Sequence, residues 1–285
     1  MIRVSACAIA AALAAGAQAV QLTDDRGVTV ALERPAERIV TLAPHLAEIA
    51  FAAGAGAKLV GASSFSRHPV EAERLPVVAS FGRVDIERVV VLKPDVVLGW
   101  RSGNSPFQVA RLERLGLTVF VTEVRTTHDI ARLIRQVGTL GGSAALAQER
   151  ARTFEIEVRG LRQDHAQARS IALFLEIWHR PMLTVNGEHL ISEAIGICGG
   201  RNVFAEAKTL TPHVSSEQLL GARPEAIVTG GYGSEALAAW RGLESVAAVR
   251  GGRVYVIDPD LLHVQGPRFL KGVRALCERL EAARR

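Results

Sequence analysis

The sequence predicts an α/β protein in which two α/β lobes with mainly parallel sheets are bridged by a single long helix. Three observations predict this fold class. Short β-branched runs alternate with stretches rich in Ala, Leu and Arg, which is typical of βαβ units. The middle of the chain, residues 126–168, has helical composition and no strand-like run. The two halves on either side of this segment also repeat one sequence pattern.

Residues 1–19 have the pattern of a secretory signal peptide. A positive charge at Arg3 precedes a stretch of small and apolar residues, and Ala17-Gln18-Ala19 fits an A-x-A cleavage site. An ordinary N-terminal helix is the alternative, but the stretch carries no polar face. We therefore expect export, with cleavage after Ala19. The rest of the chain contains no apolar run of about 18 residues, so it predicts no membrane span.

The predicted first lobe covers residues 20–125 and the second covers residues 169–285. Each is expected to contain strands at its β-branched runs. The predicted strands are Arg38–Leu42, Leu59–Ala62, Val96–Gly99 and Val119–Thr122 in the first lobe, and Ser170–Leu175, Ala226–Thr229 and Val254–Ile257 in the second.

Residues 126–168 form the predicted interlobe helix. Thr126 and Asp129 have the spacing of a capping box, and apolar residues then recur at helical spacing as far as Leu140. Gly141-Gly142-Ser143 interrupts the pattern before it resumes. Even with this break, the segment is long enough to connect two domains.

The two halves repeat a helix, a basic-Pro-acidic turn and a buried-type strand. Glu87 opens ERVVVLKPDVVLG, and Glu217 opens EQLLGARPEAIVTG. The repeat favours two lobes of similar topology, with the ligand site in the cleft between them. Both glutamates fall in the first turn of a predicted helix, where the helix dipole favours an acid. The alternative is a pair of exposed carboxylates, one per lobe, that bind arginines of a two-fold partner.

The sequence contains no enzyme motif of the GxSxG, P-loop or HExxH type, so we expect a protein that is not an enzyme. Two alternatives use the histidines near strand ends, a metal-dependent hydrolase and a Zn²⁺ or Mn²⁺ carrier. These histidines are His45, His68, His179 and His263. The net charge of +5 comes from scattered arginines without a basic run, so no nucleic-acid partner is expected.

The exported chain would keep two cysteines, Cys198 and Cys277. In an oxidising compartment a disulfide is plausible, and two buried free thiols are the alternative. A CxxC or Cys/His metal motif is absent from the sequence.

Aromatic residues make up only 5% of the chain, so their positions are informative. Phe65, Phe81 and Trp100 fall just after or between strands of the first half, and Trp178 has the matching position in the second half. Open α/β domains present their ligand face at these strand ends. An aromatic-lined cleft of this kind suits a large, flat and partly apolar ligand.

The chain resembles the periplasmic substrate-binding proteins of ABC importers for cobalamin, iron-siderophores and haem, and within them most closely the cobalamin branch. The ERxxxLKPDxV element at Glu87 is common to the wider group. The W-R-x-G-N continuation at Trp100 and the paired cysteines are more specific to the cobalamin branch. Further matches are RIVTLAPHLAEIAFAAGA, VGASSFS, ICGGRNVF and GPRFLKGVRALC.

The resemblance implies two α/β lobes bridged by one long helix, and a monomer that delivers cobalamin or a related corrinoid from the periplasm to an ABC permease with its ATPase subunits. A siderophore or haem is the alternative ligand. The transported corrinoid is not a resident cofactor, and no metal site is expected.

The resemblance also assigns roles to individual positions. It implies a Cys198–Cys277 disulfide, permease docking through Glu87 and Glu217, and ligand contacts from Phe65, Phe81 and Trp100. Four positions differ from the cobalamin branch. Leu261 and Leu262 replace aromatic residues, Phe65 replaces a tyrosine, and Thr211 replaces a tryptophan. Trp178 and His45 are expected to compensate for the lost ring contacts. The predicted ligand contacts are His45, Phe65, Phe81, Trp100, Trp178, Asp260, Leu261, Leu262, His263 and Val264.

Overall fold

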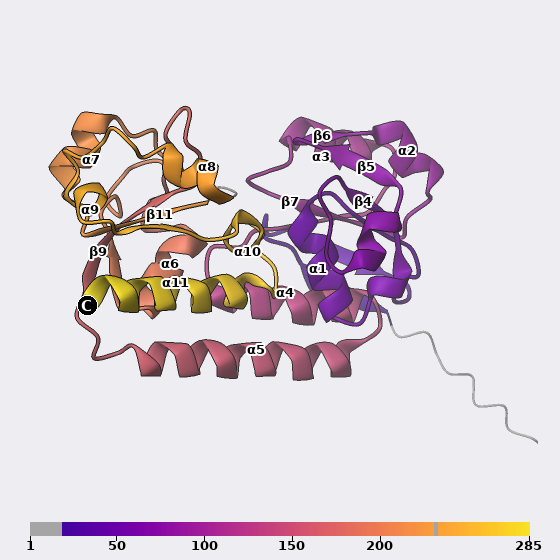
Figure 1. Ribbon diagram of the computed structural model, residues 1–285. Helices are drawn as coiled ribbons and strands as arrows, with labels where there is room; N and C mark the ends of the chain where they lie inside the picture. The colour runs from indigo at the N-terminus through magenta and orange to yellow at the C-terminus, as the bar shows by residue number, and fades with distance from the viewer. Residues whose placement is uncertain (1–18, 231–232) are drawn as a thin grey trace, which may run out of the picture.

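The computed structural model describes residues 19–230 and 233–285. The predicted signal peptide lies almost wholly outside these residues. Within them, no helix is both long enough and apolar enough to cross a bilayer. Figure 1 shows two α/β lobes side by side above a layer of helices, which confirms the predicted fold class.

The first lobe is built on a six-stranded sheet of order β6-β5-β4-β3-β7-β8. All neighbours are parallel except β5 and β6. A short antiparallel hairpin, β1 with β2, precedes it. The strands are β1 (Val20–Thr23), β2 (Thr29–Leu32), β3 (Ile39–Thr41), β4 (Leu59–Ser63), β5 (Val77–Ser80), β6 (Arg83–Val84), β7 (Val96–Trp100) and β8 (Val119–Thr122).

Helices follow the strands of this sheet, as βαβ units require. Proline begins two of them because its missing N–H costs nothing in a first turn: Pro44 starts α1 and Pro106 starts α3. The helices are α1 (Pro44–Ala52), α2 (Ile86–Val91) and α3 (Pro106–Arg114), with the 3₁₀ turns η1 (Gly56–Lys58) and η2 (Val70–Arg74).

The second lobe has a four-stranded, fully parallel sheet of order β10-β9-β11-β12. Its strands are β9 (Ile171–Glu176), β10 (Gly200–Asn202), β11 (Ala226–Thr229) and β12 (Val254–Val256). Its helices are α6 (Leu190–Ile197), α7 (Ser216–Ala222), α8 (Gly233–Ala238), α9 (Ala247–Arg250), α10 (Pro259–Leu262) and α11 (Phe269–Arg284). The predicted strands of both halves agree with these bounds to within a residue or two.

The interlobe segment consists of two packed helices, α4 (Thr127–Leu140) and α5 (Ala144–Asp164). Thr126 and Asp129 form the predicted capping box at the start of α4. The α4 helix runs beneath the first lobe, and the glycine turn at 141–142 then reverses the direction of the chain. The α5 helix of 21 residues then passes under α4 and α11 toward the second lobe, as Figure 1 shows. One long helix therefore carries the chain between the lobes.

A continuous hydrophobic core extends through this helical layer into both lobes. One cluster of buried side chains includes Ile39 under the first sheet, Phe154 on α5, and Leu173 and Leu276 in the second lobe. Shared burial across the lobes resists large rigid-body displacement, because opening the junction would expose apolar surface at roughly 25 cal/mol per Å².

The repeat seen in the sequence is a structural repeat. A short helix, α2 or α7, is capped by Asp85 or by Ser215. Each helix is followed by a basic residue with positive φ, Lys93 at 46° and Arg223 at 47°, and then by proline and a buried strand. The left-handed residue ends the helix and turns the chain into β7 or β11.

Candidate functional site

The first lobe presents an aromatic pocket at the carboxyl ends of β3, β4, β5 and β7. Phe65, Phe81 and Trp100 line a hollow of about 210 Å³ there. The rings of Phe65 and Phe81 meet edge to face, with centroids 5.2 Å apart. Phe81 is 86% exposed, and Phe65 is also exposed. The structure thus brings together the three aromatic residues that the sequence singled out in this half.

Both phenylalanines sit in backbone conformations that bulky residues rarely adopt. Phe65 has φ of 65° and Phe81 has φ of 47°. Such conformations cost of order 1–3 kcal/mol each and cluster at ligand-binding positions. The strained turns after β4 and β5 aim the two rings outward from the sheet, where a ligand can cover them.

Trp100 is the floor of this pocket and rests on His45. Their rings meet edge to face at 5.2 Å. His45 is buried, and burial lowers the pKa of its imidazole to about 3. Gly103 lies against the indole so closely that a Cβ there would come within 1.8 Å of it. His45 is therefore placed behind the aromatic wall, and a direct contact with a ligand stays a prediction.

The second lobe presents a larger pocket, of about 490 Å³, at the carboxyl ends of β9 and β11. Trp178, 62% exposed, forms part of its wall, together with Ile177 and Ala236. The wall is mostly apolar. Its polar side chains come from Glu176, His179, Arg180 and Thr229. Hydrogen bonds link Glu176 to His179 and to Thr229. In Figure 1 α8, which supplies Ala236, lies on the side of this lobe that is nearest the first lobe.

The C-terminal segment 260–264 follows β12 and is only partly available to a ligand. Asp260, Leu261 and Val264 are partly exposed. Leu262 is instead buried in the core, in contact with α11, so its side chain does not reach either pocket. The helical turn of α10 causes this difference, because it rotates one side chain of the segment inward. His263 is packed against Gly230, and burial lowers its pKa.

The remaining predicted cleft histidine, His68, is exposed in the loop after β4. Within residues 19–230 and 233–285, His, Cys, Asp and Glu side chains form no group of three that could hold a metal ion.

A largely buried ion pair joins the two lobes directly. Arg268, which precedes α11, donates twice to Oε1 of Glu48 on α1, at 2.6 and 2.9 Å. The side chain of Glu48 is 4% exposed and that of Arg268 is 21% exposed. Burial raises the pKa of Glu48 although Arg268 opposes that rise.

A further polar contact joins the second lobe to the start of the interlobe segment. Glu193 on α6 accepts hydrogen bonds from the backbone N–H and the hydroxyl of Thr127. Glu48 and Glu193 are the glutamates of the similar segments EIAFAAG and EAIGICG. Glu48 therefore joins the two lobes, and Glu193 joins the second lobe to α4. The sequence did not reveal these roles, because neither segment shows which residue its glutamate contacts.

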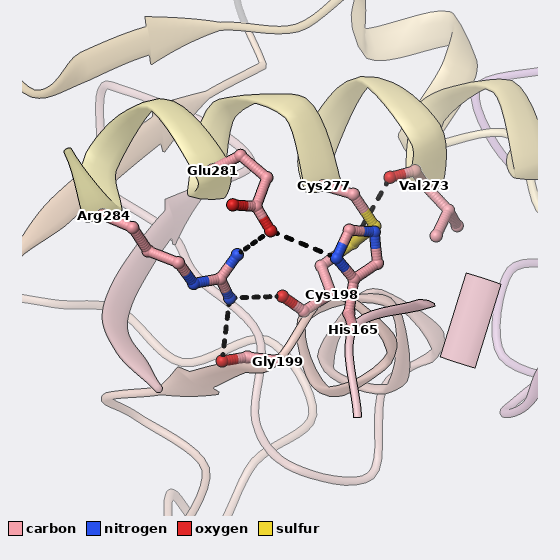
Figure 2. The surroundings of a disulfide bond; sticks show 7 residues. All are labelled: His165, Cys198, Gly199, Val273, Cys277, Glu281 and Arg284. Atoms are coloured by element: carbon pink, nitrogen blue, oxygen red, sulfur yellow. Dashed lines mark hydrogen bonds and ion pairs between the residues drawn. A yellow bond between two sulfur atoms is a disulfide. The ribbon is translucent and has the colours of Figure 1, made fainter. Parts of the chain in front are cut away.

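The predicted disulfide is present between Cys198 and Cys277. It fastens the end of α6 to the middle of α11, as Figure 2 shows. Arg284 adds a second fastening, since it donates to the carbonyl oxygens of Cys198 and Gly199 and pairs with Glu281. These bonds hold α6 and α11 together, and none of the residues that form them lines the pocket of the second lobe.

Glu87 and Glu217 are exposed on the first turns of α2 and α7, one on each lobe. Hydrogen bonding by Ser215 and the backbone lowers the pKa of Glu217. Neither glutamate lines a pocket described above.

Sequence reasoning named His179 only as one of four cleft histidines. The structure gives it a buried carboxylate partner, Glu176, three residues earlier at the end of β9. The sequence signal was a glutamate at the end of a buried-type strand with a histidine three residues later. That spacing does not show whether the imidazole turns toward the carboxylate.

A family model described as "Periplasmic binding protein" matches residues 39–261. The vitamin B12-binding protein of Vibrio cholerae serotype O1 is 34% identical over 252 residues, which cover 88% of this chain and 91% of that protein. The vitamin B12-binding protein of Pectobacterium carotovorum is 32% identical over 86% of this chain and 89% of its own length.

Solved structures agree with these sequence matches. The crystal structure of the periplasmic vitamin B12 binding protein of V. cholerae superimposes with a TM-score of 0.82 at 35% identity, covering 87% of this chain and 98% of that one. A periplasmic haem-binding protein from Roseiflexus sp. RS-1 superimposes with a TM-score of 0.78 at 23% identity, covering 87% and 99%. The second likeness is one of fold alone.

Proposed function

Because the chain belongs to the periplasmic binding protein family, we propose that it is the substrate-binding component of an ABC importer and binds vitamin B12 or a related corrinoid between its lobes. Similarity to proteins named for vitamin B12 binding, at 32–34% identity over most of the chain, supports this ligand class over haem. On this assignment the protein binds and releases its ligand without transforming it.

The observation that carries the proposal is the exposure of large aromatic side chains at the strand ends of both lobes. Phe65, Phe81 and Trp178 stand exposed although each could bury 150–250 Å² of largely apolar surface. A flat ligand placed between the pockets would cover them. With contributions of about 0.5–1.5 kcal/mol per aromatic contact beyond area burial, a few such contacts account for an affinity difference of tenfold or more.

Isothermal titration of the purified chain with cyanocobalamin tests the proposal. We expect binding at micromolar affinity or tighter. Phe81→Ala should weaken it about tenfold, the equivalent of roughly 1.4 kcal/mol. Phe107→Ala is the matched control, because Phe107 on α3 is 83% exposed but lines no described pocket. Absence of cyanocobalamin binding, with haem or a ferric siderophore bound instead, would overturn the assignment.

Delivery to the permease is proposed to use Glu87 and Glu217. Their exposure on equivalent helices supports contact with arginines related by a two-fold axis. Replacing both by Ala should leave cyanocobalamin affinity unchanged and lower uptake in cells that carry the importer. Equal uptake by the variant and the parent chain would exclude this role.

The proposal also covers maturation and motion. Export to the periplasm with cleavage after Ala19 predicts a mature chain that begins at Val20, which intact-mass measurement checks. We expect the mature chain to be a monomer by sedimentation.

The continuous core and the Glu48–Arg268 contact support only a small closure on binding. X-ray scattering should therefore show nearly the same radius of gyration with and without ligand.

A further inference from the structure

The pocket of the second lobe contains one histidine that is held as metal-binding histidines are held. Nδ1 of His179 lies 2.6 Å from Oε1 of Glu176, and the hydroxyl of Thr229 donates to Oε2 of the same carboxylate at 2.6 Å. Glu176 is buried at the end of β9. Both of its oxygens are therefore engaged, one in orienting the imidazole and the other in fixing the carboxylate.

This arrangement decides which ring nitrogen is available. A carboxylate accepts hydrogen bonds, so in the neutral imidazole the proton is on Nδ1 and the lone pair is on Nε2. His179 lines the 490 Å³ pocket, and its side chain is 30% exposed. Within the described parts of the chain no hydrogen bond involves Nε2. Metal-bound histidines commonly donate their second ring N–H to a carboxylate, which raises the basicity of the ligating nitrogen.

The other histidines with buried or partly buried rings differ from His179. Nδ1 of His165 also has a carboxylate partner, Oε1 of Glu281 at 3.3 Å, but His165 lines neither of the two pockets. Nε2 of His45 and Nε2 of His263 are buried and have no hydrogen-bond partner in the described structure. His189 uses its Nδ1 to cap α6 by accepting from the backbone N–H of Ile191. Of these histidines, only His179 combines a fixed tautomer with a partly exposed ring in a pocket.

One imidazole beside an apolar wall suits a particular kind of metal. A free Zn²⁺ ion takes four ligands, usually all from the protein in a structural site. A metal ion already held by a macrocycle has only its axial positions open and needs a single nitrogen. Trp178 and Ile177 provide the apolar surface against which the periphery of such a ring can rest.

We infer that His179 is an axial ligand to the cobalt of the bound corrinoid, with Glu176 as its positioning residue. The inference rests on the proposed function. In the binding step the lone pair of Nε2 forms a Co–N bond while the bond from cobalt(III) to an axial water breaks, and the water leaves. No electron is transferred, and Nδ1 keeps its proton. A corrinoid with an exchangeable axial water should therefore be preferred over one with a tightly held axial cyanide.

The test compares aquocobalamin with cyanocobalamin by titration calorimetry and by visible absorption. With the parent protein we expect aquocobalamin to bind at least tenfold more tightly and its corrin absorption bands to shift to those of an imidazole adduct. In His179→Ala the affinity ratio should fall to about one and the spectral shift should be lost. His128→Ala is the control, because His128 is exposed on α4 away from both pockets, and it should behave as the parent does.

Glu176→Gln provides a second variant. It keeps the imidazole but replaces the carboxylate by an amide, so we expect an intermediate affinity ratio and an incomplete spectral shift. Circular dichroism and thermal unfolding establish that each variant is folded. A purely structural role for His179 would lower the affinity for both corrinoids equally and leave their ratio unchanged.

The outcomes separate the two proposals. If the parent protein binds both corrinoids equally and the spectrum of aquocobalamin does not change, the axial-ligand inference is wrong and the proposed function stands. If the parent protein binds neither corrinoid, the proposed function fails and the inference fails with it. A shift that persists in His179→Ala would assign the nitrogen to another residue and overturn the inference.

Discussion

Replacing Arg268 by Leu should destabilise the protein by breaking the buried contact between its lobes. Arg268 is the hydrogen-bonding partner of Glu48 Oε1, while Oε2 is buried without a partner in the described structure. The Arg268→Leu change would leave the carboxylate of Glu48 buried and unpaired. Removing one partner of a buried ion pair costs about 3–5 kcal/mol. Because the arginine is itself 21% exposed, we expect the low end of that range, about 3 kcal/mol at pH 7.5.

The loss should depend on pH in a definite direction. Burial already raises the pKa of Glu48 above its ordinary value of 4.5, and the arginine is the main group that opposes the rise. Without Arg268 the pKa of the folded state rises further. A carboxyl group with a raised pKa in the folded state contributes stability that is present below the unfolded pKa and is lost as pH rises through the folded pKa. Arg268→Leu should therefore be less damaging at pH 5 than at pH 7.5.

Urea denaturation at the two pH values measures this effect. With an m-value of about 3 kcal/mol per M, a loss of about 3 kcal/mol lowers the midpoint by roughly 1 M. Adding Glu48→Gln to Arg268→Leu should remove the part of the pH dependence that comes from Glu48 and leave only the smaller contributions of the nearby Asp260 and His68.

Arg274→Leu is the matched control for this experiment. Arg274 on α11 pairs with Glu157 on α5 at 2.7 Å, but both side chains are nearly half exposed. Solvent screens such pairs, and the expected loss is below about 1 kcal/mol. The reasoning is refuted if Arg268→Leu costs no more than the control or if its cost is the same at both pH values.

Three further predictions concern single features of the fold. Burial lowers the pKa of His45 from 6.5 to about 3, so its stabilising contribution is full above pH 6.5 and falls by about 3 kcal/mol by pH 4. In urea titrations His45→Gln should lose that part of the acid sensitivity, and an unchanged dependence of stability on pH below 6.5 would contradict this. The Cys198–Cys277 disulfide closes a separation of 79 residues, so replacing both cysteines by Ser should cost about 4 kcal/mol in calorimetry under oxidising conditions, and a loss below about 1 kcal/mol would speak against it. In Gly103→Ala the new methyl must displace the indole of Trp100, which should alter tryptophan fluorescence and weaken corrinoid binding at least tenfold; unchanged affinity would show that Trp100 is not part of the site.

Several parts of the fold could be predicted from the sequence because they depend on local patterns. Seven of the twelve strands in the described residues are short apolar runs between turn residues, and their limits were predicted to within a residue or two. The strands β1, β2, β5, β6 and β10 were not predicted. The capping box at Thr126 is a local hydrogen-bonding motif and appears as predicted. The repeated helix-turn-strand units also depend on local chemistry, including the positive φ at Lys93 and Arg223.

The pairing of distant residues could not be derived in this way. Cys198 and Cys277 left two alternatives until the family resemblance and then the structure joined them. The Gly141-Gly142-Ser143 break was visible, but a break alone does not say that the chain reverses and leaves α5 to connect the lobes. Leu262 was expected at the ligand surface, whereas the turn of α10 directs it into the core.

The sequence by itself determined that each lobe is built from alternating strands and helices, where the connecting helices lie along the chain, and that aromatic residues follow the strands. Periodicity and turn chemistry act over a few residues, so they can be interpreted without knowing the packing. Only the tertiary structure decided that Glu48 pairs with Arg268 and that Glu176 orients His179. Burial and hydrogen-bond direction depend on what surrounds a side chain in space, and for these residues they decide which charges are paired and which nitrogen can bind.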